Sequence, residues 1–438
     1  MTTLPQLATT LQHVFTTTAD TTARTSGFIK RVRAFTGAQF LHTLVGTYLT
    51  TRLPTTEDFV DTAACLGVTI SPQGFAARFT SATVRYLEQI FAAALQQLIT
   101  ASPRTIPILD RFSALYIQDS TVIRLPDTLA DIWSGCGGNR AHLTAAVKGL
   151  LRLELRAGQL AGPLLLDGRS ADRSACLLPR PSARSLSIAD LGFWDLADFA
   201  LAAHDQRWWL SRCPPKLQVF DVDGQRWSLA DLLAAQTSDS CDLVVQLGVQ
   251  QRLDARLLAQ RVPPKVAEQR RRRLRATAKR KGRTVSASQL VLAGWTLLVT
   301  NVPAELLSQE EALGLYRIRW QIELLFKLWK SEGHLDETRA ERPERVQCEV
   351  YAKLLALICA HWLMLVSCWS EASSSPTRML RTMSKHAQML MQALAGTHAE
   401  IERALEELVR LLHATRPMTR RKRDPNAFDA LVQLTEHP

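Results

Sequence analysis

The stretch Tyr316–Lys330 reads YRIRWQIELLFKLWK and is the most informative part of this 438-residue chain. On an α-helix, which turns about 100° per residue, Tyr316, Arg319, Glu323 and Lys330 fall within a wedge of roughly 60°. The opposite side carries apolar side chains, namely Ile318, Ile322, Leu325 and Trp329. The pattern predicts a helix that packs on one side and presents a phenol, two cations and a carboxylate on the other.

The same polar face also suits an ordinary surface helix, because Arg and Glu four residues apart form common side-chain pairs. Taken alone, the geometry favours a face that is simply solvated. The remaining sequence has to decide between a surface helix and one wall of an active site.

The charge balance indicates a polyanionic partner. The 53 Lys and Arg residues exceed the 41 Asp and Glu residues by 12, and the sequence pI is about 9.6. Such an excess favours nucleic acid first. A hydrophobic content of 46% predicts a soluble globular protein, and the length predicts two or three domains.

Cysteine spacing and apolar runs predict the compartment. The eight cysteines include no Cys-x-x-Cys pair, so a zinc site or a disulfide framework is not expected. The N-terminus lacks the pattern of a signal peptide. The apolar run from Leu354 to Trp369 is short for a membrane span and contains His361, which favours a buried helix. We therefore expect a cytoplasmic protein with no membrane contact.

Residues 1–105 are predicted to be helical and to bind DNA ends. Within them, residues 58–80 (DFVDTAACLGVTISPQGFAARFT) resemble a helix-turn-helix, in which Ser71 and Pro72 would begin the second helix. Gln73 and Arg78 would then lie on a recognition helix. An ordinary helical hairpin fits this segment equally well.

The pattern changes three times further along the chain. Residues 106–213 contain short β-type runs, and Gly135, Gly137 and Gly138 predict a mobile loop among them. Residues 214–293 are predicted to be a β-rich basic insertion. Residues 294–340 resume with a buried strand and the opening helix. Residues 341–438 are predicted to be helical and to pair two subunits.

Two basic clusters stand out. Ten Lys or Arg residues and a single acid, Glu268, lie between Lys265 and Arg283, and RRKR occupies 420–423. The first cluster is expected to contact DNA phosphates with little sequence preference through Arg271, Arg272, Arg273, Lys279, Arg280 and Lys281. The alternatives are a disordered basic loop for the first cluster and a solubilising tail for the second.

Two aspartates are placed for metal chemistry. Asp119 closes LYIQD and Asp190 closes SLSIAD, while Asp167, at the end of PLLLDG, competes for the second place. Two strand-end aspartates and the helical Glu323 would suit Mg²⁺ or Mn²⁺, and two such ions would serve phosphodiester hydrolysis or transfer. No Gly-x-x-x-x-Gly-Lys-Ser/Thr loop occurs, so ATP is not an expected partner.

At this point the sequence resembles a known family. The pattern Y-x2-R-x3-E-x6-K, complete in Tyr316, Arg319, Glu323 and Lys330, is the signature of DDE transposases of the insertion-sequence IS-four family. The contexts IQDST, ADLGF and WTLLVTNVP are also similar to that family. The resemblance covers roughly residues 110–340.

The resemblance implies an α/β protein. Its ribonuclease-H-like catalytic core would be interrupted by a mostly β insertion and flanked by helical N-terminal and C-terminal regions. Asp119, Asp190 and Glu323 would bind two Mg²⁺ or Mn²⁺ ions. The signature residues Tyr316, Arg319 and Lys330 would contact the phosphates of the transposon end.

Two residues are less firmly placed by the resemblance. Relatives carry a Trp 28 residues before the glutamate that stacks near a flipped base, and Trp295 has this spacing, although a core role competes. Relatives often follow the second aspartate with a basic residue and Gly, whereas Leu191 precedes Gly192 here. Asp167 therefore stays an alternative to Asp190.

The predicted function is cut-and-paste transposition. Hydrolysis at the terminal inverted repeats would free a 3′-OH, which would form a hairpin before the ends are joined to target double-stranded DNA. The protein would act as a homodimer and associate with the nucleoid. A stand-alone metal-dependent nuclease and a catalytically inactive DNA-binding protein derived from a transposase are the alternatives.

Overall fold

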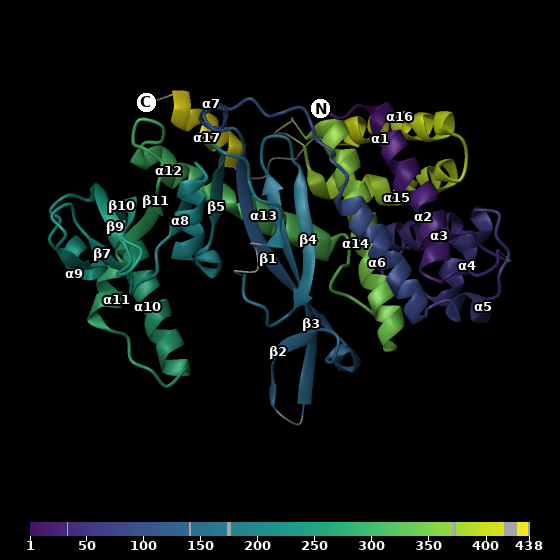
Figure 1. The fold of residues 1–438 in the computed structure, drawn as a ribbon, viewed down its shortest axis with the longest axis horizontal. Helices are drawn as coiled ribbons and strands as arrows, with labels where there is room; N and C mark the ends of the chain where they lie inside the picture. The colour runs from purple at the N-terminus through teal and green to yellow at the C-terminus, as the bar shows by residue number, and fades with distance from the viewer. Residues whose placement is uncertain are drawn as a thin grey trace. The chain divides into compact units, whose positions relative to one another are not determined.

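The computed structural model describes all residues except 33, 140–141, 173–176, 370, 372–373, 416–426 and 437–438. The chain forms two compact units, each assembled from three separate segments (Figure 1). The first unit comprises Met1–Arg104, Ser120–Ser170 and Gln321–Asp424, and the second comprises Thr105–Asp119, Ala171–Trp320 and Pro425–Pro438. The chain therefore passes from one unit to the other inside strand β1 and at the start of helix α13.

The first unit is mainly helical. Its helices are α1 (Leu4–Gln12), the π-helical turn η1 (His13–Thr18), α2 (Ala19–Thr25), α3 (Gly37–Thr50), α4 (Thr56–Cys65), α5 (Pro72–Ala76), α6 (Ser81–Leu95), the 3-10 turn η2 (Asp127–Leu129), most of α13 (Trp320–Ser331), α14 (Pro343–Cys368), α15 (Pro376–Leu394) and α16 (His398–Thr415). Hydroxyl side chains begin several of them. The side chains of Thr3, Thr36, Thr55, Ser71 and Thr80 each accept a hydrogen bond from a backbone N–H in the first turn.

Helix α14 is the core of the first unit. It packs against α3, α6 and α16, and most of its side chains are buried. It is the one helix among the described residues with the length and hydropathy to cross a membrane, but 89% of its most apolar window is buried inside the protein. The buried helix expected from Leu354 onward is therefore confirmed, and it begins earlier than expected.

Three antiparallel strands complete the first unit. Strand β3 (His142–Glu154) pairs with both β2 (Ser134–Asn139) and β4 (Leu160–Asp167). The mobile loop expected from the glycines at 135, 137 and 138 is wrong, because these residues belong to β2. A register shift between Ser134 and Gly138 absorbs the irregularity, as glycine in a strand often does.

The second unit is built on a large mixed sheet. Its strands are β1 (Leu115–Leu125, of which Leu115–Asp119 belong here), β5 (Leu186–Ala189), β6 (Trp208–Arg212), β7 (Gln218–Phe220), β8 (Arg226–Ser228), β9 (Ser240–Leu247), β10 (Leu253–Arg261) and β11 (Trp295–Thr300). The order is β1-β5-β6-β11-β10-β9-β7-β8. Strands β1, β5 and β6 run parallel, and the others join antiparallel.

Helices and 3-10 turns join or flank these strands. They are α7 (Pro107–Asp110), the 3-10 turn η4 (Leu191–Phe193), α8 (Leu196–His204), α9 (Leu229–Ala234), α10 (Pro264–Arg280), α11 (Ala287–Leu292), α12 (Gln309–Tyr316), the 3-10 turn η5 (Arg317–Arg319) and α17 (Ala427–Glu436). The buried strand expected at the start of residues 294–340 is confirmed by β11.

The segment 214–293 is mixed rather than mostly β. It holds β7 to β10 together with α9, α10 and α11. The run from Lys265 onward forms the 17-residue helix α10 because Arg, Lys, Ala, Gln and Leu are strong helix formers. The disordered-loop alternative for this run is therefore wrong over Pro264–Arg280.

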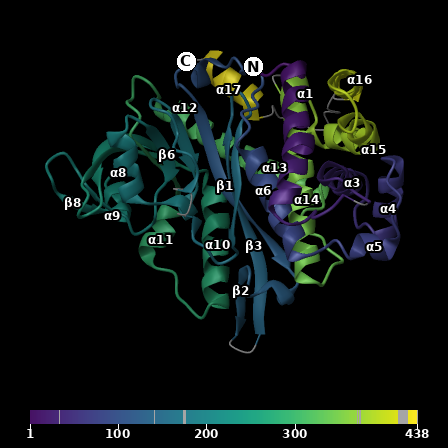
Figure 2. The same cartoon turned by 45° about the vertical axis from the view of Figure 1, so that its right-hand side comes forward.

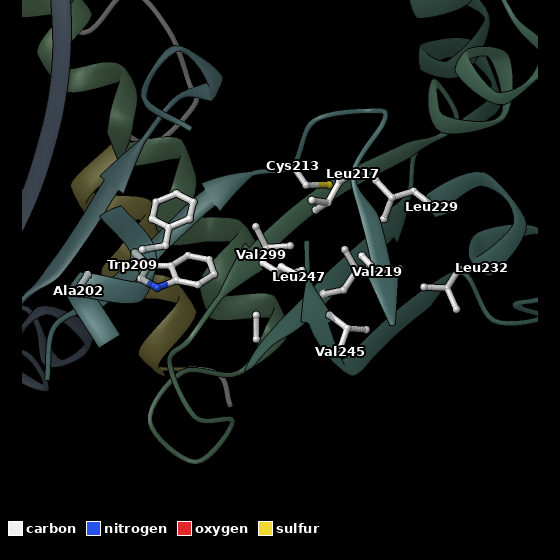
Figure 3. Close-up of a cluster of buried hydrophobic side chains, with 13 residues drawn as sticks. Ala202, Trp209, Cys213, Leu217, Val219, Leu229, Leu232, Val245, Leu247 and Val299 are labelled. Carbon is white, nitrogen blue, oxygen red and sulfur yellow. The ribbon is translucent and has the colours of Figure 1, made fainter. Parts of the chain in front are cut away.

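Apolar side chains from both parts of the sheet form a shared core (Figure 3). Trp209 of β6, Val299 of β11 and Leu257 of β10 are buried together with Leu247 and Val219. The rings of Phe199 and Trp209 stack at a centroid distance of 4.4 Å. This core fixes the parallel strands against the antiparallel ones and so fixes the strand ends that carry polar residues.

Candidate active site

Two neighbouring parallel strands bring Asp119 and Asp190 to one edge of the second unit. Leu115, Tyr116 and Ile117 of β1 pair with Leu186, Ser187 and Ile188 of β5. Continuing this register by two residues places Asp119 opposite Asp190. Because side chains alternate along extended chain, both carboxylates leave the sheet on the side taken by Ile117 and Ile188.

The expectation that Asp119 ends a strand is wrong. Strand β1 continues to Leu125, because alternation of buried and exposed residues persists through TVIRL. Only the pairing with β5 stops before Asp119. Asp119 therefore lies in the middle of a continuous strand, just beyond the last residue of β1 that pairs with β5.

Asp190 directly follows β5 and starts the turn η4, where Phe193 N–H donates to its carbonyl at 3.0 Å. Its Oδ1 is buried and has no hydrogen-bond partner among the described residues. A buried carboxylate oxygen in this state is costly unless a cation or a donor approaches it. Asp190 thus offers a ligand atom that the fold itself does not use.

A third carboxylate lies against the Asp190 turn and was missed by sequence analysis. A Cβ added to Gly192 would lie 2.6 Å from Asp172 Oδ2. A side chain at position 192 would have to displace the Asp172 carboxylate, and this close approach is the signal that Gly192 could have given. Nothing in the surrounding sequence, SADRSACLL, points to Asp172 itself.

Arg319 lies beside Asp119. Its Nη1 donates to Asp119 Oδ2 at 3.4 Å, and the two side chains are only 14% and 21% exposed. The pairing brings together two residues that are 200 positions apart in the chain. A guanidinium held this close to the aspartate could fork onto a phosphate bound at the same edge.

Tyr316 lies beside Asp190. Its hydroxyl donates to the carbonyl of Ala189 at 3.3 Å. Burial raises the pKa of Tyr316 well above its ordinary value, and the Asp190 carboxylate raises it further, while Arg319 and Arg212 act in the opposite direction. The phenol therefore stays protonated and can act as a hydrogen-bond donor.

Arg212 is a cation of this edge that sequence analysis missed. Ala189 of β5 pairs with Ser211 of β6, so the next position on β6, Arg212, lies alongside Asp190. Its side chain is exposed and its charge acts on Tyr316 and on Arg270. The available signal was an Arg at the end of the buried strand RWWLS.

Helix α12 is fixed to the sheet, which positions Tyr316 and Arg319. Ser308 caps the helix. Arg111 donates two hydrogen bonds to the Glu311 carboxylate, at 2.7 and 2.9 Å. Gln309 Nε2 donates to the carbonyl of Ala259 on β10 at 2.8 Å. These contacts anchor the start of the helix at two sides.

The continuous helix expected over Tyr316–Lys330 is wrong in one respect. Helix α12 ends at Tyr316, the tighter turn η5 follows, and α13 begins at Trp320. A 3-10 helix has three residues per turn instead of 3.6, so the angular positions expected for one continuous α-helix do not hold across η5. Ile318, Ile322 and Trp329 are fully buried as expected, whereas Leu325 is only partly buried.

Glu323 and Lys330 both lie on α13, in the first unit. Seven residues separate them, so they share one side of the helix. Lys330 Nζ donates to the carbonyl of Val122 on β1 at 3.0 Å. Glu323 lies in the first turn of α13 and is partly buried.

Asp167 lies in a different setting from Asp190. It is the last residue of β4 in the first unit, where it pairs antiparallel with Val147. Asp190 instead follows the strand that runs parallel to β1. The register therefore favours Asp190 as the companion of Asp119, while the identity of the second metal ligand stays a prediction.

The polar groups described so far suit a divalent metal, although they are not gathered as a finished site. Among the described residues, no group of three or more His, Cys, Asp or Glu side chains is arranged to hold a metal ion. The donors present are carboxylate oxygens, which Mg²⁺ and Mn²⁺ prefer, and Asp190 Oδ1 is buried without a partner within the described part of the chain.

The basic helix α10 divides into a buried and an exposed side. Arg270 donates to the carbonyl of Trp295 at 2.8 Å, and Arg271 donates to the carbonyl of Leu290 at 3.1 Å. The exposed cations are Lys265, Arg272, Arg273, Arg275, Lys279, Arg280, Lys281 and Arg283. Arg271 therefore supports the fold, whereas the other five predicted DNA contacts face solvent.

Trp295 is buried rather than presented to a ligand. Its ring is 4% exposed and packs with Leu233, Cys241 and Ala259. The Arg261 guanidinium covers the ring at 4.4 Å from its centroid. These contacts agree with the core alternative, and stacking on a flipped base stays a prediction that this burial disfavours.

The predicted recognition helix is short. Ser71 caps α5, as expected, but the helix ends at Ala76, so only Gln73 lies on it and Arg78 follows its end. Phe75 holds this turn in an aromatic cluster with Phe40 and Phe59. DNA contact by Gln73 and Arg78 stays a prediction, and RRKR at 420–423 lies outside the described residues.

The chain belongs to the DDE transposase family. The model of the family described as "Transposase DDE domain" matches residues 111–359, which include Asp119, Asp190 and the whole of α13. Members of this class are DNA-cleaving and strand-transferring enzymes that use divalent metal ions. The chain is therefore a DNA-cleaving and strand-transferring enzyme of this class.

Curated relatives extend the similarity over nearly the whole chain. The transposase for insertion sequence element IS231F of Bacillus thuringiensis subsp. israelensis is 28% identical, covering 95% of this chain and 92% of the relative. The transposases for IS231E of subsp. finitimus and IS231B of subsp. berliner are each 27% identical, with similar coverage. These relatives are named as transposases of insertion sequences.

Proposed function

We propose that this protein is a cut-and-paste transposase of the IS-four type that acts on the terminal inverted repeats of an insertion sequence. The observation that carries the proposal is the edge of the mixed sheet, where parallel strands align Asp119 with Asp190 and where Arg319 and Tyr316 lie against them. Carboxylates for metal and donors for phosphate thus share one edge.

Asp119, Asp190 and Glu323 would hold the divalent ions, Mg²⁺ or Mn²⁺, in a two-ion arrangement. Support comes from the partly buried carboxylates and from the unpartnered Oδ1 of Asp190 within the described residues. When bound, such ions activate the attacking oxygen and stabilise the leaving oxygen of a phosphodiester. The assignment of Glu323 rests on the signature spacing to Arg319.

The remaining side chains would bind and orient DNA. Arg319 and Arg212 present guanidinium groups suited to a phosphate, and Lys330 adds a point charge. Tyr316 stays protonated and donates a hydrogen bond. Holding the scissile phosphate in line with the attacking oxygen is a large part of phosphoryl-transfer catalysis.

The proposed reaction needs no ATP and no covalent protein intermediate. Water attacks the phosphodiester at the transposon end, the P–O3′ bond breaks, and the released 3′-OH then attacks the opposite strand to form a hairpin. A second water opens the hairpin, and the 3′-OH finally attacks target DNA. Each step breaks one P–O ester bond and forms one new P–O bond, either to the oxygen of water or to a 3′ oxygen of DNA.

The regions outside the sheet would supply DNA contacts and pairing. We propose that residues 1–105 bind the transposon end, that the exposed side of α10 holds DNA phosphates, and that two copies assemble on two ends. The protein would act in the cytoplasm, on the nucleoid. Pairing of the two copies would involve residues 341–438.

The test is incubation of the full chain with duplexes that carry the element's own terminal repeats, with Mg²⁺ or with EDTA. The expected result is Mg²⁺-dependent nicking, a hairpin product and joining to a target plasmid. Cleavage without joining would instead identify a nuclease. Binding without any cleavage would identify an inactive DNA-binding protein.

A further inference from the structure

The loop between β11 and α12 leads directly into the signature residues of the second unit. Helix α12 follows this loop and lies against strand β6 of the sheet (Figures 1 and 2). Its last residue is Tyr316, and the turn η5 that follows ends at Arg319. A shift of the loop would move the helix as a unit. The position of the loop therefore affects where both signature residues lie.

Arg256 of β10 holds both ends of this loop. Its Nη1 donates to the carbonyl of Val302 at 2.8 Å and to the carbonyl of Leu307 at 2.9 Å. Its Nε donates to Asp242 Oδ1 at 3.0 Å, and its Nη2 donates to Asp242 Oδ2. Arg256, Val302 and Leu307 are all buried. Because buried carbonyls need donors, one guanidinium satisfies both ends of the loop, and its fork onto a carboxylate keeps it in place.

A second arginine holds the same loop from another part of the second unit. Arg111, which directly follows α7, donates to the carbonyl of Leu306 at 3.1 Å as well as to the Glu311 carboxylate. The neighbouring carbonyls of Leu306 and Leu307 are thus bound by two different guanidinium groups. Together, Arg111 and Arg256 fix both the position and the direction of the start of α12.

The side-chain contacts at the other end of α12 serve a different purpose. The Tyr316 hydroxyl contacts the Ala189 carbonyl at 3.3 Å, and Arg319 contacts Asp119 at 3.4 Å. Both side chains would turn to a phosphate in the proposed reaction. Their present contacts therefore cannot place them during catalysis. The backbone that carries them must be placed by other contacts, and the loop before α12 provides such contacts.

We propose that Arg256 is a positioning residue for transposition. By holding the β11–α12 loop, it places Tyr316 and Arg319 at the sheet edge that carries Asp119 and Asp190. The inference rests on the proposed function, since it takes Tyr316 and Arg319 as phosphate ligands. It also gives the inserted segment a part in the reaction rate, beside the DNA affinity proposed for α10. Arg256 acts through α12 and contacts neither DNA nor metal.

The test compares Arg256→Gln with Arg207→Gln in the full chain. Arg207 pairs with Asp205, and these two side chains are 9% and 29% exposed, against 10% and 31% for Arg256 and Asp242. The Arg207 carbonyl, which accepts a hydrogen bond from Asn301, is kept in the variant. Both substitutions thus remove a buried cation from an ion pair, but only Arg256→Gln takes a side-chain donor from the loop.

Single-turnover nicking of a terminal-repeat duplex is measured with Mg²⁺ at saturating protein, at a temperature where thermal unfolding shows both variants to be folded. Arg256→Gln should lower the rate constant about ten- to a hundredfold, since a misplacement of about 1 Å at the reacting groups has an effect of that order. Duplex affinity, from fluorescence anisotropy, should stay within about threefold. Arg207→Gln should leave the rate unchanged.

Arg256→Lys is a milder variant that keeps the charge beside Asp242. An ammonium lacks the fork geometry that serves a carboxylate and two carbonyls together, so the rate should fall about three- to tenfold. This variant tests the inference even if Arg256→Gln does not fold. In an Arg319→Lys background, Arg256→Gln should cost about threefold or less, because residues that act through one another are not additive.

Equal rates for the Arg256 variants and Arg207→Gln would overturn the inference. So would an undiminished loss in the Arg319→Lys background, since Arg256 would then act by another route. If the unaltered chain showed no Mg²⁺-dependent nicking, the proposed function would fail, and the positioning role with it. If the unaltered chain nicked DNA and the variants of Arg256 and Arg207 nicked it alike, only the positioning role would fail.

Discussion

The aspartate edge of the mixed sheet and the basic helix α10 use charge in opposite ways. At the edge, Arg319 is held by Asp119, and the neutral Tyr316 hydroxyl is held by the Ala189 carbonyl, in each case by a residue of another element. On α10, most cations point into solvent, while Arg270 donates to a carbonyl of β11 and Arg271 to a carbonyl of α11.

This difference separates residues that should determine the reaction rate from residues that should determine the affinity for DNA. Metal binding and phosphate orientation need groups fixed to within fractions of an ångström, which a sheet register and buried contacts provide. Backbone affinity needs only positive charge near the phosphates, and mobile exposed side chains provide that. Substitutions at the edge should therefore lower the rate, whereas substitutions on α10 should lower the affinity and its salt dependence.

The largest expected effect is on the rate when Asp119 is changed to Asn. The substitution removes a negative ligand of the proposed metal and should lower Mg²⁺-dependent nicking at least about a thousandfold, or about 4 kcal/mol. DNA affinity should change by less than about threefold. Asp223→Asn, an exposed aspartate of the β7–β8 turn, is the matched control. If the Asp119→Asn variant still nicked DNA at the unaltered rate, Asp119 would not be a metal ligand.

Arg319→Lys should cost about ten- to a hundredfold in the nicking rate at saturating DNA. The charge remains, but the planar fork that can grip a phosphate is lost. Arg317→Lys, an exposed change two residues earlier, should have no effect. If the two substitutions gave equal rates, the fixed position of Arg319 beside Asp119 would have no catalytic meaning.

Removing the exposed cations Arg272, Arg273 and Lys279 together should weaken duplex binding about tenfold or more at 150 mM salt. The slope of log affinity against log salt should fall by as much as about 2.7. The nicking rate at saturating DNA should be unchanged. Arg270→Gln should instead lower the free energy of unfolding by about 1 kcal/mol or more, because it leaves the Trp295 carbonyl without its donor.

Tyr316→Phe should have the smallest effect, a loss of about two- to tenfold in rate, which is the worth of one hydrogen bond. Because burial raises the pKa of Tyr316 well above its usual range, the phenol stays neutral at every working pH. The pH–rate profiles of the variant and the unaltered chain should therefore have the same shape up to pH 10. If the unaltered chain showed an inflection below pH 10 that the Tyr316→Phe profile lacks, the phenol would titrate in that range and the expected neutrality would be wrong.

Much of the candidate site could be proposed from the sequence, because its residues lie in local patterns. The signature spacing identified Tyr316, Arg319, Glu323 and Lys330, and apolar runs identified the strands next to Asp119 and Asp190. Arg212 and Asp172 were not predicted, because their relation to Asp190 depends on strand pairing and on a close approach to Gly192. No local pattern encodes such pairings.

Burial could not be predicted residue by residue either. Trp295 has the family spacing of a stacking residue, yet the cluster around it and the Arg261 guanidinium cover its ring. Arg271 and Arg272 are neighbours in one basic run, yet the first supports the fold and the second faces solvent. Helix periodicity sorts such residues only after the side of the helix that packs is known.

By itself, the sequence determined the chemistry of the opening stretch, because the kinds of side chain and their spacing are local properties of the chain. It also determined the excess of positive charge that points to DNA. Only the tertiary structure decided that the stretch bends through η5 and that Asp119 and Asp190 share a register. Each of these depends on which distant elements pack together, and packing is a property of the whole fold.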